Sequence, residues 1–167
     1  MEVVSTKYTI ERKLLLDKTD RKILELLQAD ATLPLAALAE HVNLTQTPCW
    51  RRVQRLEAAG YITRRVALCD PVKLNVGVTV FVSIKTRQHN AKWFDQFAAS
   101  VSAIPEVVEF YRMSGDIDYL LRVVVADIAG YDLVYKKLIR SAELFDVSSS
   151  FAMEQIKYTT ALPVSAA

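Results

Sequence analysis

Five arginines lie close together in a chain whose net charge is only +2. Residues 50–65 contain Arg51, Arg52, Arg55, Arg64 and Arg65 against a single acidic residue, Glu57. A guanidinium group presents a planar fork of donors that binds phosphate oxygens and guanine edges. A solvated helix face normally mixes both charge signs. The stretch therefore favours a polyanionic partner, and an ordinary solvated face is the alternative.

A second group that could bind a ligand is the acidic glycine turn "SGDID", residues 114–118. A free amino acid needs an anion for its ammonium group and N–H donors for its carboxylate, and such a turn offers both. Taken alone, an acidic turn is more often simply solvated. In a regular strand only one of Asp116 and Asp118 can face a given pocket. The other is expected in solvent or paired with a base such as Arg112 or Arg122.

Cysteine and histidine are too sparse for a metal site or a nucleophilic enzyme. Cys49 and Cys69 lie twenty residues apart, and the only histidines, His41 and His89, are far apart in the sequence. The chain contains no metal-ligand spacing, Cys-His pairing or glycine-rich phosphate loop. We therefore expect no metal, no cofactor and no enzyme activity, and we expect each cysteine to lie in a core rather than act as a redox sensor.

Hydrophobic spacing predicts two helices ahead of the arginines. Residues 20–29 carry an apolar stripe at helical steps, with Asp17 or Thr19 available as the N-cap. Thr32 is expected to cap a second, short helix that has Pro34 in its first turn. These helices supply the apolar faces against which a third helix can pack.

The third helix carries most of the arginines. Asn43 can adopt the left-handed conformation that ends the second helix, and Thr45 then caps a third helix that stops at Gly60. Two helices joined by a turn of about three residues predict a helix-turn-helix motif at about residues 35–54. We place it in a DNA-binding domain of residues 16–70.

The spacing within the third helix separates a core side from a polar side. Cys49, Val53 and Leu56 fall at helical steps and must face the core. The opposite side carries amide, hydroxyl, indole and arginine groups: Gln46, Thr47, Trp50, Arg51, Gln54 and Arg55. In the major groove, amides pair with adenine and arginines with guanine. The run "YITRRVAL" that follows is expected to form a strand or wing, with Arg64 and Arg65 on backbone phosphates.

The pattern changes from Asp70-Pro71 onward. "VGVTVFVSIKT" alternates with period two and predicts a strand, and a helix follows that ends before Pro105. "VVEFYRM" and "DYLLRVVV" flank the turn at Gly115, Asp127 caps another helix, and "VSSSFAMEQIKY" predicts the last strand. This order, βαββαβ, is typical of a ferredoxin-like domain in the α+β class, here residues 71–163. The chain thus combines a winged helix-turn-helix domain with a ferredoxin-like domain.

An antiparallel sheet with helices on one side leaves its other face uncovered. We expect Phe81 and Phe110 on that face, and burial against a second copy of the chain would cover them. A homodimer is therefore expected.

Three motifs resemble the Lrp/AsnC family of transcriptional regulators. They are "LDKTDRKIL", "TPCWRRVQRLEAAGYI" and "SGDIDYLL", in that order, and the resemblance covers about residues 15 to 163. It implies a sequence-specific regulator of amino-acid metabolism whose binding to double-stranded DNA responds to a small amino acid held between subunits. It also implies dimers that assemble to an octamer. The architectural alternative is a nucleoid-associated protein without an effector.

The resemblance also assigns residues. Base reading falls to Gln46, Thr47, Trp50 and Arg51, phosphate contact to Arg52, Arg55, Arg64 and Arg65, with Thr45 and Gln54 in the same interface. The effector pocket comprises Met113, Ser114, Gly115, Asp116, Asp118 and Tyr119, with Ser148, Ser149 and Ser150 as further partners. The C-terminal run looks most like the cysteine-responsive branch, so cysteine is one candidate effector. Without an apolar leader or spanning run, we expect a cytoplasmic protein with no membrane partner.

Overall fold

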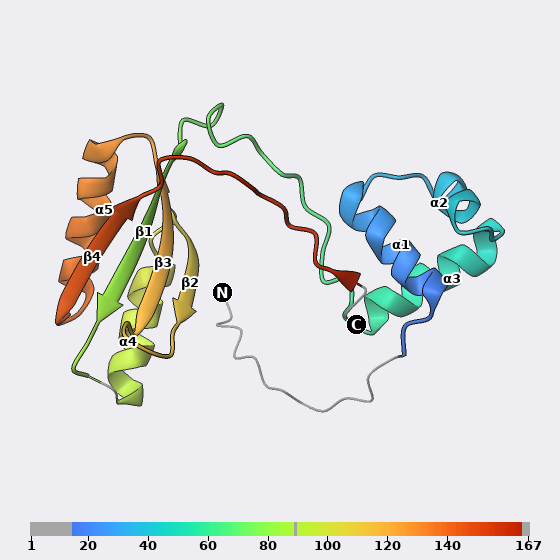
Figure 1. Ribbon diagram of the computed structural model, residues 1–167. Helices are drawn as coiled ribbons and strands as arrows, with labels where there is room; N and C mark the ends of the chain where they lie inside the picture. The colour runs from blue at the N-terminus through green and yellow to red at the C-terminus, as the bar shows by residue number, and fades with distance from the viewer. Residues whose placement is uncertain (1–14, 89, 165–167) are drawn as a thin grey trace. The chain divides into compact units, whose positions relative to one another are not determined.

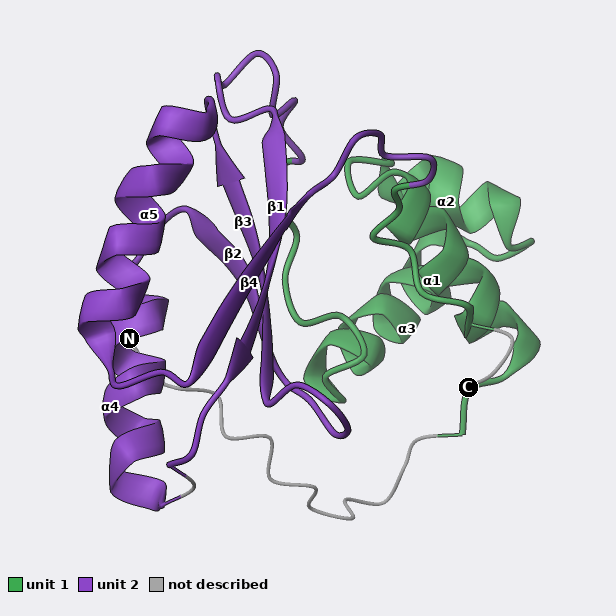
Figure 2. Ribbon diagram, turned by 60° about the vertical axis from the view of Figure 1, so that its left-hand side comes forward, with its two compact units in different colours: residues 1–67, 158–167 green, residues 68–157 purple. Residues whose placement is uncertain are grey.

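The structure is a computed structural model that describes residues 15–88 and 90–164. The chain forms two compact units, shown in Figure 2: residues 1–67 together with 158–167, and residues 68–157. Figure 1 labels the helices and strands along the chain. Each unit has its own hydrophobic core, so each is described by itself.

The described residues of the first unit form a bundle of three helices. They are α1 (Lys18–Ala29), α2 (Leu35–His41) and α3 (Gln46–Ala58). Buried side chains from all three form the core: Ile23, Leu24, Leu38, Ala39, Cys49, Val53 and Leu56. The predicted core side of α3 is thus confirmed, and burial raises the pKa of the Cys49 thiol.

The caps of these helices agree with the sequence in most places. Asp17 caps α1, with its side chain accepting the Asp20 N–H at 2.8 Å. Asn43 has a φ of 54°, which permits the sharp turn between α2 and α3. The expected Thr32 cap is wrong, because Pro34 occupies the N-cap of α2 and Thr32 instead donates to the Asp30 side chain. Thr45 is the N-cap of α3 but makes no side-chain capping bond.

The second unit is a four-stranded antiparallel sheet with two helices. Its elements in chain order are β1 (Val78–Lys85), α4 (Ala91–Ser102), β2 (Val107–Arg112), β3 (Tyr119–Val125), α5 (Ile128–Ser141) and β4 (Asp146–Phe151). The strands lie in the order β2-β3-β1-β4. Figure 2 shows α4 and α5 on the same side of the sheet. The predicted βαββαβ order and α+β class are confirmed.

Aromatic side chains pack densely between α4 and the sheet. The Trp93 and Phe97 rings stack with centroids 4.9 Å apart, and Phe97 also meets Tyr119 and Phe110. Phe110 therefore belongs to the covered core, so its expected place on the open face is wrong. The bulge between Val107 and Glu109 in β2 shifts the alternation, which the sequence pattern did not reveal.

Three further expectations require correction. Residues 61–68 contain no strand in the described structure, so the strand expected after α3 is wrong. β4 ends at Phe151, so residues 152–158 do not continue the last strand. Cys69 is exposed in the irregular chain between α3 and β1 and does not lie in a core. None of the described helices is long and apolar enough to span a membrane.

Candidate nucleic-acid interface and effector pocket

The outward side of α3 is the first candidate site. Because Cys49, Val53 and Leu56 are buried, the opposite direction of the helix carries Thr47 and Arg51. Gln54 and Arg55 flank them, and these four side chains are exposed together with Thr45, Gln46, Trp50, Arg64 and Arg65. The helix therefore presents hydroxyl, amide and guanidinium groups that suit base edges and phosphates.

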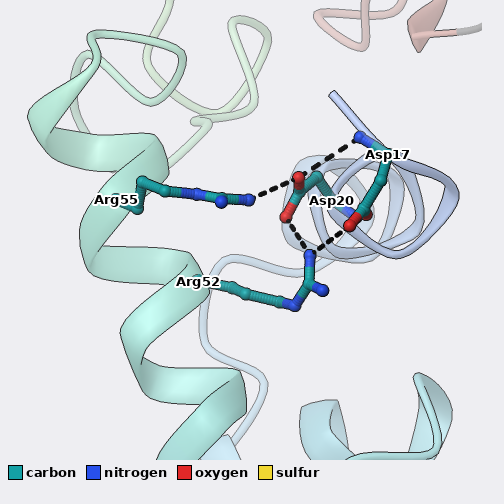
Figure 3. A network of polar contacts seen from close by, with 4 residues as sticks. All are labelled: Asp17, Asp20, Arg52 and Arg55. Carbon is teal, nitrogen blue, oxygen red and sulfur yellow. Dashed lines mark hydrogen bonds and ion pairs between the residues drawn. The ribbon is translucent and has the colours of Figure 1, made fainter. Parts of the chain in front are cut away.

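Two of the predicted phosphate-binding arginines are held by α1. Figure 3 shows that the Arg52 and Arg55 side chains both point at the first turn of α1. Arg52 Nη1 lies 2.7 Å from Asp17 Oδ2 and 2.8 Å from Asp20 Oδ1. Arg55 Nη2 lies 2.6 Å from Asp20 Oδ2. Each oxygen of Asp20 therefore receives one arginine.

The contacts of Arg52 and Arg55 matter for stability because the Asp20 carboxylate that they meet is buried. The Asp20 side chain is 0% exposed, whereas that of Asp17 is 51% exposed. A buried carboxylate is costly unless cations and N–H donors surround it, and the two arginines meet that need. The Asp20 N–H and then the Arg52 guanidinium hold the pKa of Asp17 below its usual value. Asp17 and Asp20 in turn raise the pKa of Arg52.

Glu57 engages other polar groups on the same helix. It accepts from Gln54 at 2.9 Å and pairs with Arg65 at 2.9 Å. Among the residues that the structure describes, Arg51 and Arg64 form no ion pair with a carboxylate. Arg51 is therefore an outward arginine whose charge no described carboxylate offsets.

Trp50 lies on the flank of α3 and not at its outward centre. It lines a crevice of about 250 Å³ with leucines of α1 and α2, among them Leu27 and Leu35. Much of its ring nevertheless remains exposed. Trp50 thus lies at the edge of the outward surface, beside Gln54.

The acidic turn between β2 and β3 is the second candidate site. Gly115 has a φ of 113°, a conformation that L side chains rarely adopt. The Met113 N–H donates to the Asp118 carbonyl at 2.8 Å, which closes the turn. Asp118 Oδ2 accepts the Thr86 N–H at 2.8 Å, while Asp116 is 97% exposed and pairs with Lys85. The two carboxylates therefore have different surroundings.

A pocket of about 280 Å³ opens between this turn and the start of α4. It is lined by Asn90, Ala91, Phe94, Arg112, Met113, Asp118 and Tyr119. Of the residues that the resemblance assigned to an effector, the pocket gathers Met113, Asp118 and Tyr119. The lining does not include Ser114, Gly115, Asp116 or the serines of β4.

Alternation along β4 separates its three serines. Ser149 pairs in register with the buried Val82 and forms a hydrogen bond with the Tyr131 hydroxyl of α5. Burial raises the pKa of Tyr131. Ser148 and Ser150 lie opposite Ser83 and Phe81, on the sheet face away from the helices. The three serines therefore cannot act together on one ligand in a single chain.

Sequence reasoning missed several side chains that matter at these sites. Asp20 was not recognised as the anchor of α3, although two acids at the start of a helix beside an arginine-rich helix are a usable signal. Arg112 and Asn90 line the pocket and were not assigned to it. Asn90 directly precedes an apolar helical stripe and caps α4 through the Trp93 N–H, a pattern that could have located this end of the pocket.

A helix-turn-helix unit with an exposed arginine face, joined to a separate unit with a small polar pocket, defines a ligand-responsive type of DNA-binding protein. Comparison with known families agrees. The Lrp/AsnC ligand binding domain matches residues 79–162, and the winged helix-turn-helix DNA-binding family matches residues 16–63. The chain belongs to the Lrp/AsnC family of transcriptional regulators. It is a DNA-binding regulator with an amino-acid-binding domain.

Individual relatives cover nearly the whole chain. The chain is 57% identical to the DNA-binding transcriptional activator DecR of Escherichia coli K12, over 90% of this chain and 99% of DecR. It is 51% identical to the glutamate uptake regulatory protein of Zymomonas mobilis, over 89% of this chain and 91% of that protein. The crystal structure of an AsnC family regulator from Agrobacterium tumefaciens superposes with a TM-score of 0.88 at 62% identity, over 90% and 99%. A transcriptional regulator from Neisseria meningitidis, solved as a complex with L-Met, superposes with a TM-score of 0.85 at 37% identity. The match covers 90% of this chain and 97% of that one.

Proposed function

We propose that α3 reads operator DNA and that a small sulfur-containing amino acid, cysteine or methionine, binds beside Asp118 and changes the DNA affinity. The observation that carries the proposal is the pocket that joins a carboxylate, Asp118, to a guanidinium, Arg112, within one small volume. In this division of labour residues 16–70 bind DNA, and residues 71–163 bind the effector and form the oligomer.

Thr47 and Arg51 are the base-reading residues in this proposal, supported by their outward position on α3. Gln46, Trp50 and Gln54 lie at the edges of the same surface. Thr45, Arg52, Arg55, Arg64 and Arg65 contact phosphates. Arg55 is suited to this because Asp20 holds only one of its terminal nitrogens at 2.6 Å, and its side chain is still 47% exposed. A guanidinium fixed on one side can present its remaining donors to a phosphate without further loss of side-chain entropy.

The pocket chemistry fits a free amino acid. Asp118 would receive the ammonium group, and Arg112 with the N-terminal end of α4 would receive the carboxylate. Met113, Phe94 and Tyr119 line the remaining wall, and sulfur makes favourable contacts with aromatic rings. The pocket is small compared with drug-sized sites of about 300 to 1,000 Å³, which favours a compact ligand.

A larger groove along α5 is less suitable for this ligand. It has a volume of about 650 Å³ and is lined by Lys136, Lys137 and Arg140, with Glu106 as its acidic residue. Glu106 already pairs with Lys137 at 3.3 Å. An ammonium group would therefore meet net positive charge there.

A homodimer, extending to an octamer, is the proposed assembly. The sheet face away from the helices carries Phe81 and Tyr111, both partly exposed large side chains. Arg122 crosses the same face to Glu109 at 2.6 Å. Partial burial would raise the pKa of Glu109, but hydrogen bonds from Arg122 and Tyr111 outweigh it and lower that pKa. The face therefore carries a charged Arg122–Glu109 pair beside exposed aromatic side chains. Burial against a second copy would remove the apolar area from water.

The test combines calorimetry against the twenty amino acids with DNA binding to a duplex selected from random sequence by the protein. We expect cysteine or methionine to bind and to shift the DNA affinity. Saturating binding without a shift would contradict the regulatory part. No binding by any amino acid would favour the architectural alternative. Light scattering on the same sample measures the oligomer.

A further inference from the structure

The chain passes between its two units twice. One passage lies at residues 67–68 and the other at residues 157–158, because residues 158–167 rejoin the helical unit. Figure 2 shows this return in the colour of the helical unit. We call residues 158–164, the described part of this stretch, the return segment.

Gln28 of α1 holds the return segment by its main chain. Gln28 Oε1 accepts the Leu162 N–H at 2.6 Å, and Gln28 Nε2 donates to the Leu162 carbonyl at 3.1 Å. The primary amide thus binds one residue in the way a neighbouring strand would. The Leu162 side chain is 74% exposed, so the backbone and not the side chain is recognised.

Two further contacts support the docking. Val164 packs against the core of the helical unit, beside the cluster that contains Ile23 and Leu56. Within the segment the Ala161 N–H donates to Thr159 Oγ1 at 3.1 Å, which ties the main chain just before Leu162 to a neighbouring side chain. The segment therefore has a defined conformation where it meets α1.

We propose that the return segment is a second tie on the DNA-binding unit, anchored by Gln28, and that this tie sets the half-site spacing that the protein accepts on DNA. A unit attached by one flexible linker can swivel about it, whereas two attachment points leave only a hinge about the line that joins them. Less freedom raises the effective concentration of the second helix-turn-helix at a correctly spaced half-site and lowers it elsewhere. This inference rests on the proposed dimer.

The experiment uses the full chain and two matched changes. Gln28→Glu keeps the size and the acceptor for the Leu162 N–H but places a carboxylate oxygen against the Leu162 carbonyl. Leu162→Pro removes the N–H itself, and its control, Leu162→Ala, keeps the N–H while shortening an exposed side chain. Glu25→Gln, on an exposed position of α1, is the control for the first change. Each protein is titrated with a selected duplex, the same duplex with about five inserted base pairs, and an isolated half-site.

Both tie variants should lose roughly fivefold to tenfold in affinity for the correctly spaced duplex, and should discriminate less against the inserted one. Affinity for the isolated half-site and the affinities of both controls should stay unchanged. Equal losses on the half-site and the full duplex would mean that the changes merely damage α1, and would overturn the proposal. Unchanged spacing discrimination would also overturn it.

Light scattering distinguishes a failure of the dimer proposal from a failure of the tie. If light scattering gives a monomer, the dimer and the spacing inference fall together. If it gives a dimer that shows no spacing preference before any substitution, only the tie is wrong.

Discussion

Two pairs of aspartates, one in each unit, show how similar spacing leads to different chemistry. Asp17 and Asp20 start α1, and Asp116 and Asp118 flank the turn into β3. Asp17 and Asp116 are exposed, whereas Asp20 is buried and Asp118 is partly buried. Asp20 is enclosed by two arginine side chains, whereas Asp118 accepts a backbone N–H from Thr86 and lines a pocket.

The Asp20 and Asp118 carboxylates differ in how much of their hydrogen-bonding capacity is already used by partners in the chain. Asp20 has each oxygen matched by a guanidinium, so it can hold other groups in place but has little capacity for a ligand. Asp118 accepts the Thr86 N–H on Oδ2, and it also lines the pocket beside α4. Asp20 therefore acts as a structural anchor in one unit, and Asp118 is the carboxylate that we propose for ligand binding in the other.

The largest expected effect comes from breaking the anchor. Asp20→Asn keeps the shape but leaves Arg52 and Arg55 without their buried partner, and should lower the free energy of unfolding by about 2 to 3 kcal/mol. The value lies below that for a fully buried pair because both arginines are partly exposed. Urea denaturation measures it. A loss no greater than that of an exposed substitution such as Glu25→Gln would mean that Asp20 is not an anchor.

The second prediction compares Arg55, which pairs with Asp20, with Arg51, which pairs with no described carboxylate. Arg51→Ala should cost about 1 to 3 kcal/mol on selected DNA and little on random DNA. Arg55→Ala should weaken binding to all sequences and lower the salt slope by about one unit. Titrations at several salt concentrations measure both. If Arg51→Ala lost the same affinity on both DNAs, its assignment to base reading would be wrong.

The third prediction concerns the other pair. Asp118→Asn keeps an acceptor for the Thr86 N–H but removes the charge, and should weaken amino-acid binding by about tenfold or more. Asp116→Asn should leave that binding nearly unchanged, because Asp116 points into solvent beside Lys85. Calorimetry on the full chain compares the two. The reverse order of effects would place the ligand outside the pocket described.

Sequence patterns predicted the helices, strands and their order because hydrophobic periodicity and caps are local. Asp17, Asn43 and Asp127 were each expected as caps or turn residues and occupy those positions. Phe110 was misplaced because a bulge in β2 reverses the alternation, and nothing in the sequence reveals a bulge without its partner strand.

The candidate sites were less predictable because they depend on contacts between distant residues. The partners of Arg52 and Arg55 lie 32 to 35 positions away, at Asp17 and Asp20 at the start of α1, and periodicity does not detect such pairs. The return segment is a similar case, since Gln28 and Leu162 are 134 residues apart. The expected last strand ended at residue 158, so the sequence pattern gave no expectation for the main chain of Leu162.

The smallest expected effect concerns the exposed partner in the first pair, and it depends on pH. The pKa of Asp17 lies below its ordinary value of 3.8, chiefly because the Asp20 N–H and then Arg52 stabilise its charged form. The contribution of the charged Asp17 carboxylate to the free energy of unfolding is therefore fully present above about pH 4, and it is lost as the pH falls through the lowered pKa. Asp17→Asn should thus reduce the free energy of unfolding by less than about 1 kcal/mol near neutral pH, because the side chain is half exposed. The difference between the two proteins should shrink in acid, since protonated aspartic acid and asparagine then carry the same charge. Urea denaturation at pH 7 and at pH 3 compares them, and a difference that grew toward acid would show that the charge of Asp17 does not stabilise the start of α1.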